Sequence, residues 1–168
     1  HPDVRVFKVM NGKGKRIGTF LGDYFARPSK RSGAWMSAFQ SQHNLGRHGQ
    51  KPVIYNVMNF AKGEPALLSL DDARTLFHEF GHALHALASN VEYRTLNSGV
   101  RDYTEFQSQL LERWLPTDEV IGKYLLHAKT GEPMPAELLG KIERASTFNQ
   151  GFSTTEYLAS AILDMKYH

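Results

Sequence analysis

The chain has 168 residues, 41% of them hydrophobic and 22% charged, which is an ordinary composition for a soluble globular protein of one or at most two domains. The absence of Cys excludes a disulfide framework and any thiolate metal site, so a metal would have to be bound by His and carboxylate side chains. The formal charge of +3 is modest, and no apolar run reaches the roughly 20 residues that span a bilayer, so no membrane partner is expected.

The first 60 residues favour strands. Val4 to Met10 is rich in β-branched residues, Asn11 and Gly12 form a turn signal, and Ile17 to Phe25 resumes the extended pattern, which predicts a hairpin. Val53 to Phe60 is a further short strand candidate.

Residues 27–51, between the second and third strand candidates, carry several cations among Gly, Ser and Gln. This pattern predicts an irregular, solvated loop. The alternative, a basic patch that binds nucleic acid, is disfavoured, so nucleic acid is not an expected partner.

The chain turns helical after Ser69, which with Asp72 forms a capping-box pattern. A helix is expected over about 70–88, with a buried apolar stripe formed by Ala73, Leu76, Phe77, Phe80, Leu84 and Leu87. Further helices are expected at about 102–115, 117–129, 135–149 and 154–166. The predicted fold class is therefore α+β and mainly α, with a strand-rich part over 1–66 and a helical part over 67–168.

Residues 78–82 read His-Glu-Phe-Gly-His, an HExxH motif in the middle of the first expected helix. Residues four apart lie on one face of a helix, so His78 and His82 can bind a single metal ion. Glu79, beside the first ligand, can take a proton from the attacking water. The motif therefore predicts hydrolysis of a polarised carbonyl.

Catalytic zinc takes three protein ligands and keeps one position open, so a third ligand is needed. His85 lies seven residues after His78, about 10 Å along the helix, which is too far for the same ion. We expect His85 to pack against or support the ligands instead.

The remaining source of a ligand is a carboxylate on the helix expected over 102–115. Tyr103, Phe106, Leu110 and Trp114 form its apolar stripe, and Glu105, Ser108, Gln109 and Glu112 lie opposite. Taken alone, this pattern favours a plain amphipathic helix with a wet polar side. Because the two histidines need a partner, we expect Glu105 to be the ligand, Glu112 the reserve candidate, and Gln109 a residue that orients an imidazole.

Several strings along the chain follow one known pattern. The longest are Thr75 to His85 and Arg101 to Phe106, and the others are Tyr24 to Pro28, Gly33 to Met36, Tyr55 to Val57, Thr130 to Pro135, Phe148 to Phe152 and Thr155 to Ala159. Together they resemble the thimet oligopeptidase family of zinc peptidases over nearly the whole chain, and within it the bacterial peptidyl-dipeptidases.

The resemblance implies a zincin-type catalytic core, with a small N-terminal sheet, an active-site helix and further helices after it. It implies one zinc ion per chain, bound by His78, His82 and Glu105, with Glu79 as the general base. It further implies that Val53 to Phe60 is an edge strand that holds the substrate backbone. Tyr55 on this strand and Gly99 in the Asn97-Ser98-Gly99 loop are the implied substrate-binding residues.

The implied activity is release of C-terminal dipeptides from short peptides by a full-length parent, and internal cleavage of short peptides is the alternative. The chain departs from the family in three ways: the segment before Glu105 is about two residues shorter, Gln107 replaces the usual Pro, and a downstream Gly- and Tyr-rich segment is missing. For this chain alone, a zinc-binding but catalytically incomplete module is therefore a third hypothesis.

The chain begins at His1 without Met and ends at His168, so we expect a fragment of a longer protein. Its expected partners are short peptides and the remainder of the parent chain. The start carries no signal-peptide pattern, which predicts a cytoplasmic protein, with the periplasm as the alternative compartment.

Overall fold

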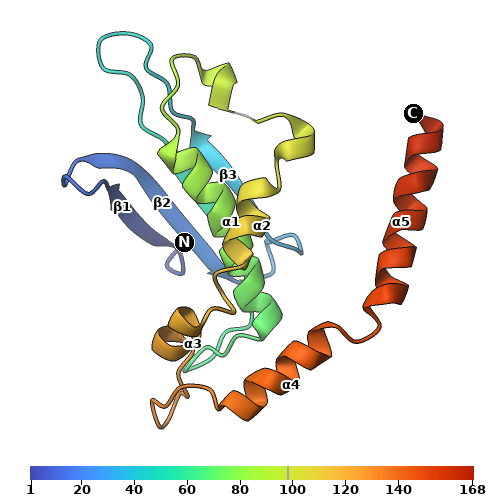
Figure 1. Ribbon diagram of the computed structural model, residues 1–168. Coiled ribbons are helices and arrows are strands. Elements are labelled where there is room, and N and C mark those ends of the chain that lie inside the picture. The colour runs from blue at the N-terminus through green and yellow to red at the C-terminus, as the bar shows by residue number, and fades with distance from the viewer. Residues whose placement is uncertain (98) are drawn as a thin grey trace. The chain divides into compact units, whose positions relative to one another are not determined.

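The predicted hairpin is present in the computed structural model, which describes residues 1–97 and 99–168 (Figure 1). Strand β1 (Arg5–Met10) pairs antiparallel with β2 (Arg16–Phe25), and the side chain of Asn11 accepts hydrogen bonds from two backbone N–H groups in the turn. The chain divides into two compact units, His1–Val120 and Ile121–His168, and each is described by itself.

The sheet in the first unit has four strands in the order β1-β2-β4-β3. Strand β4 (Val53–Phe60) has the predicted bounds and pairs in parallel with β2 and antiparallel with β3 (Trp35–Gln40). The expectation that β4 is an edge strand is therefore wrong, because β3 pairs along its free side and becomes the edge itself.

The expectation of an irregular, solvated segment over 27–51 is also wrong in part. Strand β3 forms inside this segment, and the side chain of Lys30 is only 4% exposed. Its ammonium contacts Asp23 and donates to three backbone carbonyls at the ends of β2 and β4, so this cation stabilises the sheet.

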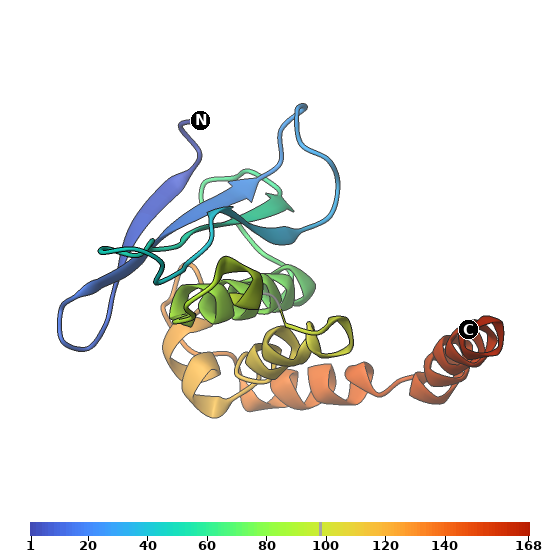
Figure 2. The same cartoon turned by 90° about the horizontal axis from the view of Figure 1, so that it is seen from above.

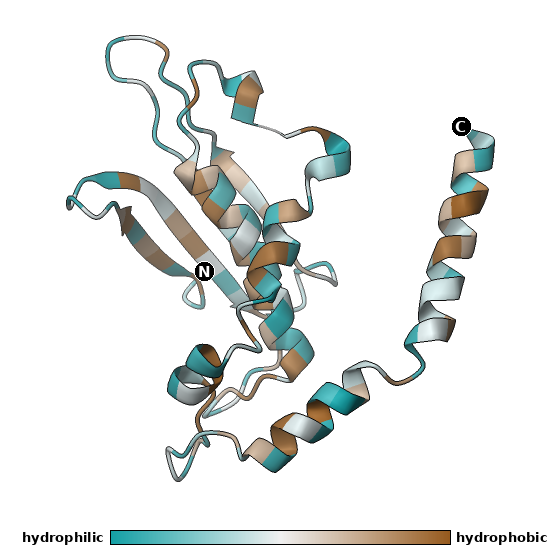
Figure 3. Ribbon diagram, in the orientation of Figure 1, coloured by the Kyte–Doolittle hydropathy of each residue, from teal (hydrophilic) through white to brown (hydrophobic). Residues whose placement is uncertain are grey.

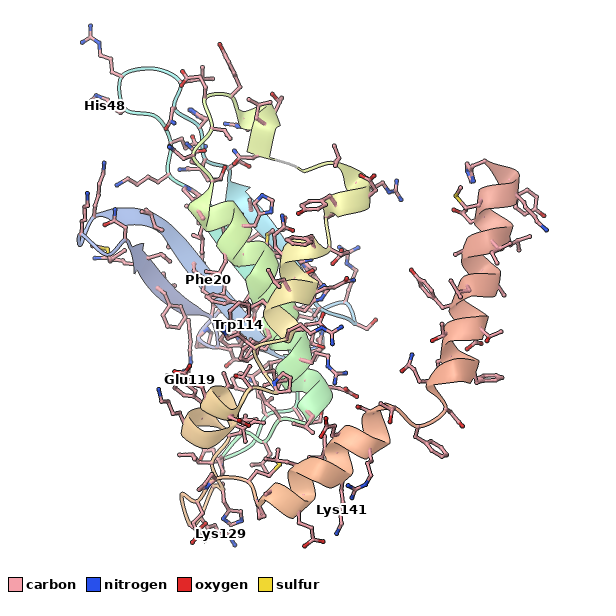
Figure 4. All side chains as sticks on the ribbon, viewed as in Figure 1. Phe20, His48, Trp114, Glu119, Lys129 and Lys141 are labelled. Atoms are coloured by element: carbon pink, nitrogen blue, oxygen red, sulfur yellow. The ribbon has the colours of Figure 1, made fainter. Side chains whose placement is uncertain are left out.

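Helix α1 (Leu70–Ala88) has the bounds that the sequence predicts and begins with the predicted capping box of Ser69 and Asp72. Its contact with the sheet is made by Ala83 and Leu87, which pack against Phe20 and Ile54 (Figure 4 labels Phe20). The predicted apolar stripe is wrong in part, since Phe80 is 37% and Leu84 40% exposed. The sheet covers the helix face that carries Ala83 and Leu87, and the ring of Phe80 meets that of Phe20 edge-on, with centroids 5.3 Å apart.

The single helix predicted over 102–115 is replaced by shorter elements. These are the 3-10 helix η2 (Arg101–Tyr103) and the α-helix α2 (Phe106–Glu112). A further 3-10 helix, η1 (Arg94–Asn97), precedes them. Figure 2 shows α1 lying between the sheet and α2, so the first unit has three layers. In this arrangement the Ser108 face of α2 is turned inward, and the predicted apolar stripe is about half exposed.

The remaining helices are α3 (Asp118–Tyr124), α4 (Ala136–Ser146) and α5 (Gln150–Tyr167). Helix α3 ends before the predicted position because Leu126 and Pro133 form an isolated bridge, with the N–H of His127 donating to the carbonyl of Glu132 at 2.8 Å. Asn149, with a positive φ of 54°, separates α4 from α5. The predicted α+β class is confirmed. Among the described helices, none is long and apolar enough to cross a bilayer.

Candidate metal centre

The two histidines of the HExxH motif lie on one face of α1 and point their Nε2 atoms at the same carboxylate oxygen. Oε2 of Glu105 is 3.0 Å from Nε2 of His78 and 3.1 Å from Nε2 of His82. The imidazole rings are nearly perpendicular, with centroids 5.0 Å apart. Within the described part of the chain, these three side chains are the group whose ligand atoms converge, all within 4.8 Å of one another.

The spacing of these atoms fits a tetrahedral zinc ion. With ligand bonds of about 2.0 Å, neighbouring ligand atoms of such an ion are about 3.3 Å apart, close to the two distances measured here. Two imidazole nitrogens and one carboxylate oxygen are also a donor set that catalytic zinc uses. His78, His82 and Glu105 therefore form a group that can provide the protein ligands of a metal ion.

Glu105 stands at the N-terminal end of α2, where Ser108 fixes its carboxylate. The hydroxyl of Ser108, which is fully buried, donates to Oε2 of Glu105 at 2.8 Å. This hydrogen bond, together with the nearby His82 and His78, holds the pKa of Glu105 below its usual range. The carboxylate is therefore kept in the charged form that a metal ligand needs.

The two helices approach each other closely at Gly81 and Ser108, and this crossing brings Glu105 to the histidines. A Cβ atom on Gly81 would lie 2.6 Å from Cα of Ser108 and 2.8 Å from the carbonyl oxygen of Gln107. Only a residue without a side chain fits here. The Gly of the motif thus has a structural role that its spacing alone did not indicate.

Glu79 is buried, with 8% of the residue exposed, and it faces β3. Burial raises the pKa of this carboxyl above its ordinary value, and the positive potential of His78 and His82 opposes the shift. The backbone of Met36 on β3 also hydrogen-bonds to the carboxylate, which is a smaller opposing effect. A carboxylate of raised pKa is a stronger base than an exposed glutamate.

An open pocket of about 310 Å³ lies beside Glu79 and His78. Its wall also includes Ala34, Arg74, Thr75 and Glu112. Glu79 and His78 thus line a concave surface of the first unit.

The structure places the remaining sequence-predicted residues as follows. His85 is exposed and hydrogen-bonds through Nδ1 to the side-chain amide of Gln107, and Gln109 is exposed on α2. Tyr55 packs against Phe39 on β3, with ring centroids 4.4 Å apart and the rings tilted by 34°, and by strand alternation it points away from the α1 side of the sheet. Gly99 is exposed, and its neighbour Ser98 lies outside the described residues.

Two contacts at the site were missed at the level of sequence. Ser108 and Glu112 lie three and seven residues after Glu105, so helical spacing put them on one face, but it did not indicate what they touch. In the structure, Ser108 touches Glu105, and Oε1 of Glu112 is 2.6 Å from Nδ1 of His78.

The geometry of an HExxH helix facing a glutamate on a second helix agrees with the comparisons to known proteins. The family model "Peptidase family M3" matches residues 1–168, and the chain belongs to this family. The resemblance described from the sequence is confirmed.

Within this family, the chain is similar to relatives of two kinds. The chain is 47% identical over its whole length to the dipeptidyl carboxypeptidases of Salmonella typhimurium and Escherichia coli. It is 37% identical to oligopeptidase A of Escherichia coli, also over its whole length. The chain spans about a quarter of the length of these relatives, 25% of the dipeptidyl carboxypeptidases and 26% of oligopeptidase A.

Proposed function

We propose that this chain carries the zinc site and general base of a metallopeptidase, in a zincin-type core that binds one zinc ion. The observation that supports this most directly is the convergence of His78, His82 and Glu105 on one point, with Glu79 beside them. Membership of Peptidase family M3 indicates the same chemistry.

A bound zinc ion would act as a Lewis acid on the scissile carbonyl and lower the pKa of the attacking water. Glu79 accepts the proton of that water and later delivers it to the leaving amine. Its burial suits both steps, because a raised pKa brings the proton affinity of the carboxylate closer to that of its reaction partners.

We further propose that the substrates are short peptides and that the full-length parent releases C-terminal dipeptides. The 47% identity to two dipeptidyl carboxypeptidases favours this specificity. Internal cleavage of short peptides is the second candidate, favoured by the 37% identity to oligopeptidase A. Peptides with a free C-terminus and their amidated forms separate the two, since only the first activity depends on the terminal carboxylate.

The remainder of a parent chain is a proposed partner. The chain spans about a quarter of the length of its relatives, and large apolar side chains of α5, including Phe152, Tyr157 and Met165, are more than 70% exposed. Figure 3 shows hydrophobic residues recurring along α5. Exposed apolar surface of this kind is expected to be covered in the whole protein. By itself, the chain is expected to bind zinc but to cleave peptides slowly.

The proposal is tested by measuring zinc content and dipeptide release for this chain and for its longer parent. Glu79→Gln should retain zinc and lower cleavage by the parent about 10²–10⁴-fold, because only proton transfer is lost. Glu105→Gln should lose zinc as well as activity. Glu143→Gln, an exposed residue of α4 in the other unit of the chain, makes the same charge change and should alter neither zinc content nor activity. Normal zinc content in Glu105→Gln together with loss in Glu112→Gln would show that the third ligand is Glu112.

A further inference from the structure

Glu112 lies at the C-terminal end of α2, beside the first histidine of the motif, and the proposed mechanism gives it no part. Oε1 of Glu112 is 2.6 Å from Nδ1 of His78, which is within hydrogen-bond distance. The side chains are 24% and 26% exposed, so the pair is largely shielded from water.

The two nitrogens of His78 contact different carboxylates. Nδ1 faces Glu112, and Nε2 faces Oε2 of Glu105 at 3.0 Å. Because the nitrogens lie on opposite sides of the ring, a proton on Nδ1 leaves the lone pair of a neutral imidazole on Nε2. That lone pair points at the place where the three ligand atoms converge.

We propose that Glu112 is a positioning residue for the metal centre: it accepts the Nδ1 proton of His78, fixes the tautomer and holds Nε2 toward the metal. Glu112 is thus not a ligand, since it contacts the wrong side of the ring and stands outside the converging group. The inference rests on the proposed zinc site. Carboxylates that orient a ligating histidine in this way also raise its basicity.

The same face of α2 carries both interactions that fix the ligands. Ser108 holds Glu105, and Glu112, four residues further on, holds His78. Both lie on the side of α2 that packs against α1 near Gly81. A short helix therefore supplies one ligand and the hydrogen bonds that orient two of the three.

The test uses this chain and measures zinc affinity by competition with a chelator, without any activity assay. Glu112→Ala should weaken zinc binding about 10–100-fold, the range seen when such orienting groups are removed. Glu112→Gln keeps an oxygen that can accept the Nδ1 proton and should restore part of that loss. Glu143→Ala, an exposed residue on α4, should leave the affinity unchanged.

A second readout separates positioning from general stability. In ¹H–¹⁵N spectra of the histidine rings of the metal-free wild-type chain, His78 should show a proton on Nδ1 that is hydrogen-bonded to Glu112. This pattern should persist in Glu112→Gln and disappear in Glu112→Ala. The wild type could also fail to bind zinc while its His78 signal is present and depends on Glu112. That result would overturn the proposed function and leave the positioning role supported.

The inference is overturned by unchanged zinc affinity in Glu112→Ala, or by a His78 ring spectrum that does not respond to this substitution. It is also overturned if Glu112→Ala weakens zinc binding only because part of the chain unfolds. In that case the His78 signal of the molecules that stay folded would match that of the wild type. Loss of affinity in Gln109→Ala but not in Glu112→Ala would transfer the role to Gln109.

Discussion

Asp23 is a buried carboxylate at the end of β2 whose charge is balanced by two cations from the segment that follows. Its oxygens contact the guanidinium of Arg27 at 2.5 Å and the ammonium of Lys30 at 2.9 Å. The hydrogen bond from Arg27 is the main reason that the pKa of Asp23 lies below its usual value, with Lys30 adding to the effect and burial opposing it. The cluster fixes the ends of β2 and β4 through the backbone bonds of Lys30.

Asp23→Asn should lower the free energy of unfolding by about 2 kcal/mol at pH 7, since hydrogen bonds to charged groups contribute about 1.5–3 kcal/mol each. Because the folded-state pKa is depressed, this stabilisation is complete above the unfolded value near 4 and is lost as the pH falls through the folded value. Urea unfolding of both chains between pH 7 and pH 2 measures the difference, which should shrink only below about pH 4.

Asp164→Asn provides a matched control, because that side chain is 75% exposed on α5. It should change little at any pH. A deficit of Asp23→Asn that stayed constant down to pH 2 would contradict an origin in the charge of Asp23.

The site residues differ in how far the sequence could predict them. His78, Glu79 and His82 follow from helical spacing, because all three lie within one helix. The third ligand had to be a carboxylate from another element, and the resemblance of the chain to a known family indicated Glu105. The contact of Glu112 with His78 depends on how two helices cross, and the sequence of either helix contains no signal for that crossing.

At the scale of elements, the crossing of α1 and α2 determines whether a metal site exists. Two side chains of α1 and one at the start of α2 must meet, and the buried contact between Gly81 and Ser108 sets their separation. His82 is the next residue after Gly81, and His78 lies three residues before it, so both histidines are within one turn of this contact. A change in the helix spacing should therefore be transmitted directly to the ligand distances.

Gly81→Ala should weaken zinc binding by at least about tenfold, similar to the loss of a ligand-orienting group. The added methyl would overlap the backbone of Ser108 and Gln107, so α2 must move away and carry Glu105 with it. Overpacking costs about 1–3 kcal/mol, against a gain of about 1 kcal/mol from the better helix propensity of Ala. Chelator competition and thermal unfolding measure the two effects separately.

Gly122→Ala on α3 is the control for this change, since a Cβ there meets nothing within 4 Å. It should keep the zinc affinity and be neutral or stabilising. Equal zinc affinities for Gly81→Ala and Gly122→Ala would show that helix spacing does not control the site.

The elements also show where sequence patterns were sufficient. The capping box and helical period predicted both ends of α1, and the apolar run predicted β4, because these signals are local. Strand β3 was missed since its residues lie among Gly, Ser and cations and become a strand only by pairing with β4. That pairing is the reason that β4 lies inside the sheet and not at its edge.

At the scale of the whole chain, the proposed site lies in one unit, and the exposed apolar side chains of α5 lie in the other. His78, Glu79, His82 and Glu105 belong to the unit His1–Val120. The second unit consists of helices whose described residues include only one buried apolar side chain, Ile121. Short helices of this kind are marginal in water without a packed face.

A shortened chain of residues 1–124, which ends with α3, should therefore bind zinc nearly as tightly as the 168-residue chain. The two affinities should agree within about twofold, because changes in parts of a protein that do not contact each other are nearly independent. The physical reason is that every proposed ligand, together with Ser108 and Glu112, lies before residue 113. Chelator competition on both chains is the measurement, with circular dichroism to establish that the shorter one is folded. The separate peptide of residues 125–168 should bind no zinc. A tenfold loss in a folded 1–124 chain would mean that the second unit helps to hold the metal centre, and zinc binding by 125–168 would mean that the chain has a further site.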